Sequence, residues 1–450
     1  MSLSVVILAA GKGTRMFSEQ PKVLHKLADQ PMLQYVIDIA NELNPKNISV
    51  IVGYKAKEVK HAFPHEKVNW ILQEKQLGTG DAVKCAIPNL IGQQTLILYG
   101  DVPLIKINEL KKLIKKGEKG LSILTFDKIN PTGYGRIVRG LNDVEAIVEE
   151  KDCSDDQKEI TEVNTGIMVA DTKYLINWLS LISNINSQKE YYLTDIVSLA
   201  KKDSIKINTI EASSEITISG VNSKIELAKM ERAIQLKKSN ALMEQGVTLL
   251  DPSRTDIRGH LDCGTDVVID VGCIFEGKVK IGKNVTIGAY SILKDSEILN
   301  DSIIKPYSHI DNAKVGKNNI IGPYARLRPG TVTNENVHIG NFVEIKNSKI
   351  DSGSKINHLS YVGDSIVGKN VNVGAGTITC NYDGVNKHQT IIEDNVFIGS
   401  NTQLVAPVKI GAGSTIGAGS TITKNTPVNK LSLSRAKQTS IPSWEKPKKS

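Results

Sequence analysis

The residues that first suggest chemistry are two glycines and two cations that follow a short apolar run. Gly11 and Gly13 come directly after the run 4–10, and Arg15 and Lys22 follow them. Glycines let backbone N–H groups approach phosphate oxygens closely, and the two cations supply positive charge for a polyphosphate. The spacing matches neither the GxGxxG dinucleotide fingerprint nor a Walker A loop. Taken alone, the loop is equally well read as a tight turn between a strand and a helix.

A second group of polar side chains lies in the C-terminal half of the chain. Arg328 and Lys346 fall on consecutive turns of a repeat that is described below, and His358 follows them. The stretch 379–387 breaks the register of that repeat, so we expect it to loop outward. Loops on a rigid scaffold frequently carry binding and catalytic residues. The sequence therefore predicts a second site, separate from the glycine loop.

The N-terminal half has the pattern of an α/β domain. Short apolar runs at Ser4–Ala10, Ile48–Val52, Thr95–Tyr99 and Leu121–Phe126 alternate with helix-like segments such as Leu33–Leu43. This alternation predicts βαβ units and a mostly parallel, Rossmann-like sheet. Ligands of such sheets bind beyond the carboxyl ends of the strands, where the glycine loop stands. We expect this domain to cover residues 1–222.

The segment that follows has helical composition and spacing. Residues 223–246 are expected to form a connecting helix, because the stretch from Ser223 to Glu244 contains neither Gly nor Pro. The inward positions that the spacing predicts are Ile225, Ala228, Ala233, Leu236 and Leu242.

From about Val247 the apolar residues recur every six positions. Examples are Ile269, Phe275, Ile281, Ile287 and Leu293, then Ile298, Ile304 and Ile310, then Val315, Ile321 and Leu327, and again Ile398, Leu404, Ile410, Ile416 and Ile422. A period of six fits a prism of short parallel strands with one aliphatic side chain pointing inward per face. Residues 247–450 are therefore predicted to form a parallel β-helix of hexapeptide repeats with a basic C-terminal tail.

Composition limits the kind of protein. The chain has 450 residues and a net charge of +8, with Arg435, Lys437, Lys446, Lys448 and Lys449 near its end. No aromatic–basic platform accompanies this charge, so no nucleic acid is expected as a partner. The five cysteines are scattered and form no CxxC pair, which indicates reduced thiols in a cytoplasmic protein. The apolar start is too short to span a bilayer, so no membrane association is expected.

The glycine loop resembles that of the sugar-1-phosphate nucleotidyltransferase family. The segments that carry the resemblance are LAAGKGTRM with Pro21-Lys22, Gln73–Ala82, Tyr99–Leu104, Gly133–Arg136, Ile147–Asp152, Asn164–Gly166 and Gly220–Asn222. It implies nucleotide and sugar-nucleotide binding by Leu8, Ala9, Ala10, Gly11, Gly13, Lys22, Gln73, Gly78, Thr79, Tyr99, Gly100, Asp101, Gly135, Glu149, Asn164 and Asn222. Catalytic roles fall to Arg15 and Lys22, and Asp101 with Asn222 would hold Mg²⁺, a hard cation that prefers oxygen ligands.

The C-terminal half resembles the acetyltransferase half of bifunctional N-acetylglucosamine-1-phosphate uridylyltransferase/glucosamine-1-phosphate acetyltransferases, so the resemblance covers essentially the whole chain. The matching segments are Ala325–Gly330, Gly340–Lys346, Asn357–Asp364, Asn372–Thr377 and Thr379–Lys387. It implies a left-handed β-helix, a homotrimer assembled through these helices, and active sites between neighbouring prisms. His358 would be the general base, since a histidine side chain exchanges protons near neutral pH.

The same resemblance assigns the remaining ligand contacts of the C-terminal half. The sugar phosphate is expected to be bound by Arg328, Lys346, Tyr361 and Asn372, and acetyl-CoA by Ala375, Ser400, Ala418 and Arg435, with Asn381 and Tyr382 lining the sugar pocket and contacting acetyl-CoA. The implied reactions are acetylation of glucosamine-1-phosphate and then uridylyl transfer from UTP, which releases pyrophosphate. The product, UDP-N-acetylglucosamine, is a precursor of peptidoglycan and lipopolysaccharide.

Two other readings compete with a bifunctional enzyme. One is a nucleotidyltransferase with a single activity whose β-helix only binds a regulator. It leaves Arg328, Lys346 and His358 unexplained. The other is a non-enzymatic assembly scaffold, for which degraded phosphate loops would be expected, whereas Gly11 and Asp101 are both present.

Overall fold

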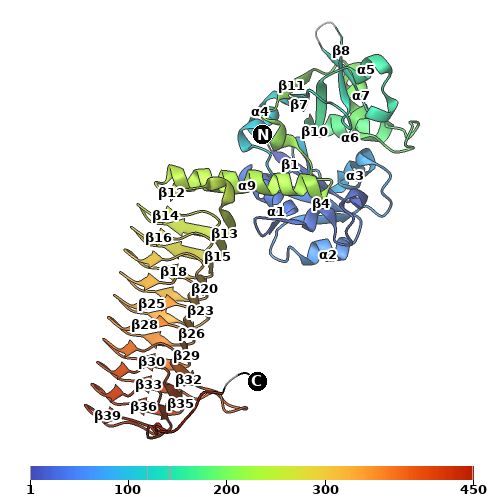
Figure 1. Ribbon diagram of the computed structural model, residues 1–450. Helices are drawn as coiled ribbons and strands as arrows, with labels where there is room; N and C mark the ends of the chain where they lie inside the picture. Colours follow the sequence, from blue (N-terminus) through green and yellow to red (C-terminus); the bar gives the residue numbers. More distant parts are fainter. Residues whose placement is uncertain (1, 119, 141–142, 448, 450) are drawn as a thin grey trace. The chain divides into compact units, whose positions relative to one another are not determined.

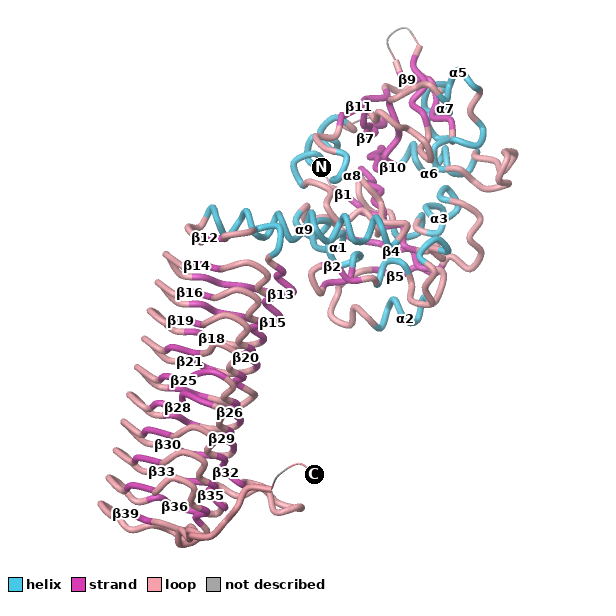
Figure 2. Tube along the Cα trace, viewed as in Figure 1, coloured by secondary structure: helices cyan, strands magenta, loops and turns pink. Residues whose placement is uncertain are grey.

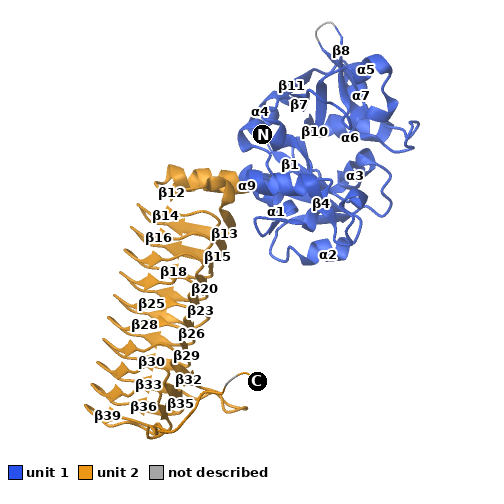
Figure 3. Ribbon diagram, viewed as in Figure 1, with its two compact units in different colours: residues 1–234 blue, residues 235–450 orange. Residues whose placement is uncertain are grey.

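The computed structural model describes residues 2–118, 120–140, 143–447 and 449. The chain separates into two compact units, residues 1–234 and 235–450 (Figure 3). Of the basic tail residues named above, Lys448 lies outside the described residues. All five cysteines are free thiols. Within the described ranges, no helix is long and apolar enough to cross a membrane.

The first unit is built on a nine-stranded sheet (Figure 1). Its main path runs β11-β7-β10-β6-β1-β4-β5, and β8 and β9 extend it from β10. The strands are β1 Leu3–Ala9, β4 Asn47–Val52, β5 Asn69–Leu72, β6 Gln94–Tyr99, β7 Leu121–Asp127, β8 Arg136–Arg139, β9 Val144–Val148, β10 Glu162–Asp171 and β11 Ile207–Glu211. Strand β1 pairs in parallel with β4 and β6, whereas β10 runs antiparallel to β6 and β7. The mostly parallel α/β sheet is thus confirmed, with two strands reversed: β10, which lies between β6 and β7, and β9 beyond β8.

Helices cover both faces of this sheet. They are α1 Met32–Glu42, α2 Ala56–His61, α3 Thr79–Cys85, α4 Ile107–Lys116, α5 Asp155–Lys158, α6 Thr172–Leu181, α7 Ile196–Lys202 and α8 Glu215–Ile218. Val5 and Ile7 of β1 face a core shared with α1 and α4, while Val6 and Leu8 face a core shared with α3, α6 and α7. Burial on both faces explains why β1 is a continuous apolar run rather than an alternating one.

Helix α9, Lys224–Glu244, contains the division between the two units (Figure 3). Most of the inward positions expected for it are wrong: Ile225 is 70% exposed and Leu236 is 48% exposed, and only Leu242 is fully buried. The side chains buried instead are two apolar ones, Met230 and Ile234, and two polar ones, Gln235 and Ser239. Gln235 accepts a hydrogen bond from the Ile257 backbone N–H and donates one to its carbonyl. Hydrogen bonds satisfy the Gln235 amide and the Ser239 hydroxyl. The buried face was misidentified because Met230 and Ile234 were not among the expected inward positions and because apolar spacing does not signal buried polar residues.

The second unit is a parallel β-helix, as predicted (Figure 2). One sheet comprises β12 Thr248–Leu249, β14 Val268–Ile269, β16 Thr286–Ile287, β19 Ile303–Ile304, β22 Ile320–Ile321, β25 His338–Asn341, β28 Lys355–His358, β31 Asn372–Val373, β34 Phe397–Ile398, β37 Thr415–Ile416 and β39 Leu431–Ser432.

The remaining strands wind around the other faces of the coil. They are β13 Asp256–Cys263, β15 Ile274–Ile281, β17 Ile292–Lys294, β18 Glu297–Ile298, β20 His309–Asp311, β21 Lys314–Val315, β23 Arg326–Leu327, β24 Val332–Thr333, β26 Glu344–Lys346, β27 Lys349–Ile350, β29 Tyr361–Gly363, β30 Ser365–Val367, β32 Ile378–Cys380, β33 Thr390–Ile392, β35 Gln403–Val405, β36 Val408–Ile410 and β38 Thr421–Ile422.

The register shows how the period of six builds the coil. Ile287 pairs with Ile304, and Ile304 pairs with Ile321, so one turn takes 17 residues, close to three faces of six. All the aliphatic positions expected to point inward are buried in one continuous core. Corners of the coil use positive φ angles: Tyr290, Tyr307 and Tyr324 have φ of 57°, 60° and 55°, and their rings stack. The coil therefore places equivalent residues of successive turns directly above one another.

Candidate active sites

A cavity of about 270 Å³ opens at the carboxyl ends of β1 and β6 in the first unit. Ten residues expected to bind nucleotide line it: Leu8, Ala9, Ala10, Gly11, Lys22, Gln73, Gly78, Thr79, Tyr99 and Asp101. Four residues that were not predicted also line it: Val23, Gln76, Ala82 and Glu190. The parallel strands thus bring together the glycine loop and the acid that follows β6.

Lys22 and the two expected metal ligands converge in this unit. The Lys22 ammonium lies 2.5 Å from Oδ2 of Asp101 and donates a hydrogen bond of 3.0 Å to Oδ1 of Asn222. Asn222 comes from far along the chain, and the backbone N–H of Val221 beside it donates to the Asp101 carbonyl at 3.0 Å. A carboxylate oxygen and an amide oxygen therefore point at one cationic group.

This donor set fits a hard divalent cation. Magnesium prefers oxygen ligands and usually takes only one or two carboxylates from the protein, leaving other positions to phosphates and waters. Among the described residues, no group of three or more His, Cys, Asp or Glu side chains could hold a metal. Asp101 and Asn222 are thus suited to a metal that arrives with a phosphorylated ligand, and poorly suited to a closed structural site.

Two glycines of this site cannot carry a side chain. Gly78 has a φ of 115°, and a Cβ there would lie 2.5 Å from the Tyr191 carbonyl oxygen. The Gly80 N–H donates to that same carbonyl, and the Tyr191 N–H donates to the Leu77 carbonyl. Gly13 has a φ of 65°, and its Cβ would lie 2.7 Å from Cβ of Lys22. The left-handed backbone at Gly13 and Gly78 therefore lets Lys22 and the Tyr191 segment approach the cavity closely.

The residues expected to bind the sugar gather around Tyr99. The Asn164 backbone N–H donates to the Gly135 carbonyl at 2.8 Å, and a Cβ on Gly135 would lie 3.5 Å from Oε2 of Glu149. Burial raises the pKa of Glu149, although a hydrogen bond from Thr194 opposes this shift. Burial also raises the pKa of Tyr99, and the carboxylates of Glu149 and Asp101 add to the effect. The pKa of each group thus reflects a shared, enclosed environment.

Arg15 and Gly100 were expected in the nucleotide site but do not line this cavity. Arg15 lies exposed in a short 3-10 turn, Thr14–Met16, and does not line the cavity. Gly100 packs beneath the site, where a Cβ would lie 3.1 Å from Leu33 and 3.2 Å from Ala9. Gly100 therefore supports the strand end rather than lining the cavity.

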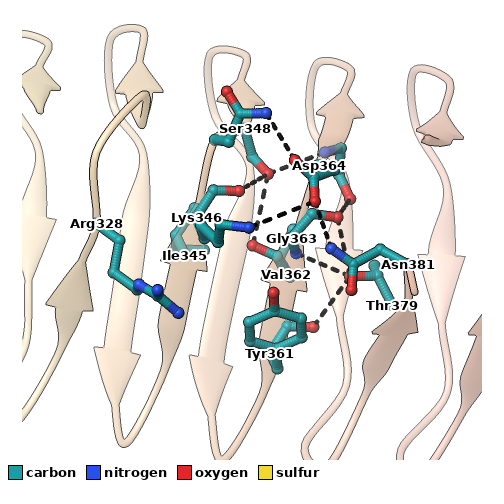
Figure 4. A network of polar contacts seen from close by, with 12 residues as sticks. Arg328, Ile345, Lys346, Ser348, Tyr361, Val362, Gly363, Asp364, Thr379 and Asn381 are labelled. Atoms are coloured by element: carbon teal, nitrogen blue, oxygen red, sulfur yellow. Dashed lines mark hydrogen bonds and ion pairs between the residues drawn. The ribbon is translucent and has the colours of Figure 1, made fainter. Parts of the chain in front are cut away.

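A second cluster lies on successive turns of the β-helix (Figure 4). Nη1 of Arg328 lies 2.7 Å from Oε1 of Glu344, and Nζ of Lys346 lies 3.8 Å from Oδ2 of Asp364. The amide of Asn381 donates to Asp364 at 2.5 Å. Hydrogen bonds from Asn347 and Asn381, and the nearby charge of Lys346, lower the pKa of Asp364 against the effect of burial. Lys346 and two amides thus surround the Asp364 carboxylate, whereas Arg328 is paired with Glu344.

His358 lies exposed at the end of β28, directly opposite Asn341 in the strand register. Its Nδ1 lies 2.9 Å from Oδ1 of Asn341. Because an amide oxygen can only accept, this contact assigns the ring proton to Nδ1 and leaves the lone pair on Nε2. The imidazole is therefore oriented with a free proton acceptor, which is the arrangement a general base requires.

The loop that leaves the coil register carries two expected contacts and one further cation. Residues 381–387 leave the coil as expected, with an antiparallel bridge between Tyr382 and Lys387. Thr379 and Cys380, which were expected in the loop, instead stay in the coil at the end of β32 and pair with β35. Asp383 accepts hydrogen bonds from the Val385 and Asn386 backbones, at 2.8 and 2.7 Å. The nearby ammonium of Lys346 lowers the pKa of Lys387. Two lysines whose charges influence each other form an attractive place for a phosphate dianion.

The residues expected to contact acetyl-CoA form a column. The Ala375 carbonyl accepts from the Asn401 N–H at 2.7 Å, the Ser400 carbonyl accepts from the Gly419 N–H at 2.8 Å, and the Ala418 carbonyl accepts from Nη1 of Arg435 at 2.8 Å. Ala375, Ser400, Ala418 and Arg435 thus lie on successive turns along one edge. Tyr361 stands within the cluster in Figure 4, whereas Asn372 lies on β31 in the other sheet.

Several residues of these clusters were not singled out from the sequence: Asn341, Glu344, Asp364, Lys387 and Glu190. A signal for two of them was present. Asn341 precedes His358 by 17 residues, and Asp364 precedes Asn381 by 17. Once the length of one coil is known, each is predicted to lie directly beside its partner. Glu190 carries no such signal, because it reaches the cavity through the tertiary packing of the Tyr191 segment.

Comparison with known proteins agrees with the division of the chain into an α/β unit and a β-helix unit. A family model described as "MobA-like NTP transferase domain" matches residues 5–141, "GMPPB C-terminal domain" matches 257–339, and "Bacterial transferase hexapeptide (six repeats)" matches 389–424. A protein of Nitrosospira multiformis named "Bifunctional protein GlmU" is 54% identical over 451 residues, covering 99% of this chain and 98% of the relative.

Other relatives carry the same name. One from Nitrosomonas europaea is 56% identical over 454 residues and covers 100% of this chain and 99% of the relative. One from Methylobacillus flagellatus is 53% identical over 448 residues and covers 99% of this chain and 98% of the relative. Since these matches extend over both units and both candidate sites, the chain belongs to the GlmU family of bifunctional proteins.

Proposed function

We propose that the chain is an enzyme with two active sites that make UDP-N-acetylglucosamine in two steps. The β-helix unit transfers an acetyl group from acetyl-CoA to glucosamine-1-phosphate. The first unit then transfers a uridylyl group from UTP to N-acetylglucosamine-1-phosphate and releases pyrophosphate. The observation that carries this proposal is that each unit has its own set of chemical groups. Lys22, Asp101 and Asn222 converge in the first unit, and the β-helix unit carries the cations Arg328 and Lys346 and the oriented imidazole of His358.

In the first unit, the sugar phosphate oxygen attacks the α-phosphorus of UTP while pyrophosphate leaves. This reaction needs little covalent chemistry from the protein and depends on positioning and charge neutralisation. Gln73, Gly78 and Thr79 hold the uracil, and the glycine loop with Lys22 holds the phosphates. Glu149 and Asn164 hold the sugar. Arg15, although exposed here, comes from the same loop and neutralises charge on the pyrophosphate.

Asp101 and Asn222 are proposed to hold Mg²⁺ in this site. The metal neutralises phosphate charge when it is bound. The support for the assignment is the convergence of their two oxygens on the Lys22 ammonium. Asn222 is itself held in place, since its backbone N–H donates to Oε2 of Glu226 at 2.6 Å.

In the β-helix unit, His358 removes a proton from the amine of glucosamine-1-phosphate so that the nitrogen can attack the thioester of acetyl-CoA. The new amide bond forms as the carbon–sulfur bond breaks, and the leaving thiolate of CoA takes the proton from the imidazolium of His358 and departs as a thiol. Nε2 receives the proton because Nδ1 is engaged with Asn341. Arg328, Lys346 and Lys387 bind the phosphate, Tyr361, Asn372, Asn381 and Tyr382 line the sugar pocket, and Ala375, Ser400, Ala418 and Arg435 contact the CoA.

We also propose that the protein is a cytoplasmic homotrimer assembled through the β-helix. The acetyl-transfer residues lie on the outside of the coil, where His358 and Tyr382 are exposed. A neighbouring copy would enclose them.

Two substitutions separate the two activities. One assay supplies glucosamine-1-phosphate and acetyl-CoA and follows free thiol, and a second supplies N-acetylglucosamine-1-phosphate, UTP and Mg²⁺ and follows pyrophosphate. His358→Ala is expected to lower thiol release about 10²–10⁴-fold, the usual contribution of a general base. It should still release pyrophosphate from N-acetylglucosamine-1-phosphate. Asp101→Ala is expected to do the reverse.

The wild-type protein distinguishes this proposal from its rivals. Release of pyrophosphate without any thiol would identify a nucleotidyltransferase whose β-helix has no acetyltransferase activity. Release of neither product would support an assembly scaffold.

A further inference from the structure

The position of the Lys22 ammonium has a consequence for metal binding. Nζ lies 2.5 Å from Oδ2 of Asp101 and 3.0 Å from Oδ1 of Asn222. The Lys22 and Asp101 side chains are only 15% and 12% exposed, so this contact is largely shielded from solvent. The ammonium therefore stands at the point where the two oxygens converge.

The backbone around these side chains leaves room for this arrangement. A Cβ on Gly13 would lie 2.7 Å from Cβ of Lys22, and a Cβ on Gly220 would lie 3.1 Å from Oδ2 of Asp101. Both Gly13 and Gly220 thus allow a close approach that a side chain would obstruct. The N–H of Val221, which donates to the Asp101 carbonyl, fixes the segment that carries Asn222. Lys22 is the flexible member of the group, since its charge sits on a four-carbon stem.

We propose that Lys22 is a specificity-determining residue that keeps free divalent metal out of this site and admits it together with the triphosphate. The proposal rests on the proposed function, in which Asp101 and Asn222 hold the metal. An ammonium and a divalent ion repel each other strongly at contact distance in a poorly solvated place. Lys22 must therefore leave the two oxygens before they can bind metal.

The nucleotide supplies the other partner for Lys22. Lys22 lines the same cavity as Ala9, Ala10 and Gly11, whose backbone is expected to cradle the phosphates. A triphosphate carries more negative charge than one carboxylate, so it draws the ammonium away from Asp101. The same movement frees Asp101 and Asn222 and neutralises the phosphates, which couples nucleotide binding to metal binding.

The test measures metal affinity of the full-length protein without any nucleotide. Mn²⁺ is titrated into the protein, and the free ion is followed by electron paramagnetic resonance. Lys22→Met keeps the length of the side chain and removes its charge, and it is expected to bind free Mn²⁺ at least about tenfold more tightly than the wild type. Lys22→Arg retains a cation and is expected to stay close to the wild-type affinity.

A second substitution shows where the ion binds. Asp101→Asn in the Lys22→Met background is expected to abolish the gain. Lys22→Gln, a second neutral variant, replaces Lys22→Met if circular dichroism shows that the methionine variant is unfolded. Equal Mn²⁺ affinity in the wild type and a folded neutral variant, with binding still lost in Asp101→Asn, would overturn the role of Lys22 alone. Mn²⁺ affinity that does not respond to Asp101→Asn in either background would instead overturn the metal site of the proposed function.

Discussion

Nδ1 of His358 lies 2.9 Å from Oδ1 of Asn341, the residue directly opposite it on the preceding turn of the β-helix. The contact joins strands β25 and β28, so the coil itself sets the distance between the two side chains. It determines which ring nitrogen carries the proton. Asn341 is therefore a positioning residue for His358, and its effect on acetyl transfer can be separated from any effect on folding.

Removing the Asn341 acceptor should slow acetyl transfer without abolishing it. Asn341→Ala is expected to lower kcat for thiol release about three- to tenfold, which corresponds to one hydrogen bond of roughly 1 kcal/mol. Asn341→Asp keeps an oxygen acceptor and is expected to lose less activity. Pyrophosphate release by the first unit serves as the internal control and should not change. A kcat for Asn341→Ala equal to that of the wild type would show that His358 needs no orientation from this side chain.

The effect of Lys346 on the pKa of Lys387 predicts a pH dependence for phosphate binding. Lys346 lowers the pKa of Lys387, so in the free protein Lys387 loses its proton at a lower pH than an ordinary lysine. A bound phosphate favours the charged form and raises that pKa again. As the pH rises through the lowered pKa, binding must be accompanied by proton uptake, and the affinity for glucosamine-1-phosphate is expected to fall.

Isothermal titration calorimetry measures this effect directly. The binding enthalpy at alkaline pH should differ between two buffers that have different ionisation enthalpies, because a proton is taken from the buffer. Lys387→Arg is the matched control, since a guanidinium stays charged throughout this pH range. The control should show a smaller buffer dependence of the binding enthalpy, because it lacks the proton uptake at residue 387. The same buffer dependence in both proteins would place the proton uptake elsewhere.

The backbone at Gly78 predicts a selective loss of uridylyl transfer. With φ at 115° and the Tyr191 carbonyl 2.5 Å from the place of a Cβ, Gly78→Ala imposes both backbone strain and a clash. Backbone strain of this kind costs roughly 1–3 kcal/mol, so we expect pyrophosphate release to fall at least about tenfold. Thiol release should be preserved.

Gly246 provides a control in which a Cβ adds backbone strain without a steric clash. Gly246 has a φ of 92°, but nothing lies within 4 Å of its missing Cβ. Gly246→Ala therefore adds only the strain, at a place outside both clusters, and both activities at 25 °C should remain near the wild-type level. If Gly78→Ala retained full pyrophosphate release, the Tyr191 segment would have to move without cost to the nucleotide site.

Local periodicity predicted the scaffold better than it predicted the contacts. The inward residues of the β-helix were found because one aliphatic per six positions is a repeated requirement of the coil. The buried face of helix α9 was misidentified because its buried apolar residues Met230 and Ile234 were not chosen. Two further positions, Gln235 and Ser239, are buried through hydrogen bonds that no apolar pattern signals. Glu190 was missed because it enters the cavity by the packing of distant segments. Motif spacing therefore identifies residues that share a strand end or a coil position. It does not identify residues, such as Glu190, that enter a site only through tertiary packing.

Two neighbouring isoleucines provide a matched test of the coil itself. Ile304 has no exposed surface and lies in the core column between Ile287 and Ile321, whereas Ile303, beside it on β19, is 42% exposed. Ile304→Ala leaves a cavity in a core that cannot collapse easily, because the paired strands fix both neighbours. We expect it to lower the free energy of unfolding of the β-helix unit by about 2–5 kcal/mol.

Ile303→Ala removes the same atoms from a half-exposed position, so its cost should stay below about 1 kcal/mol. Thermal unfolding followed by circular dichroism compares the two variants, and thiol release after heating shows which unit has unfolded. Pyrophosphate release should survive heating better than thiol release in Ile304→Ala, since the first unit has its own core. Equal destabilisation by both substitutions would mean that the six-residue period does not identify the inward side chain, and the β-helix register would then have to be reassigned.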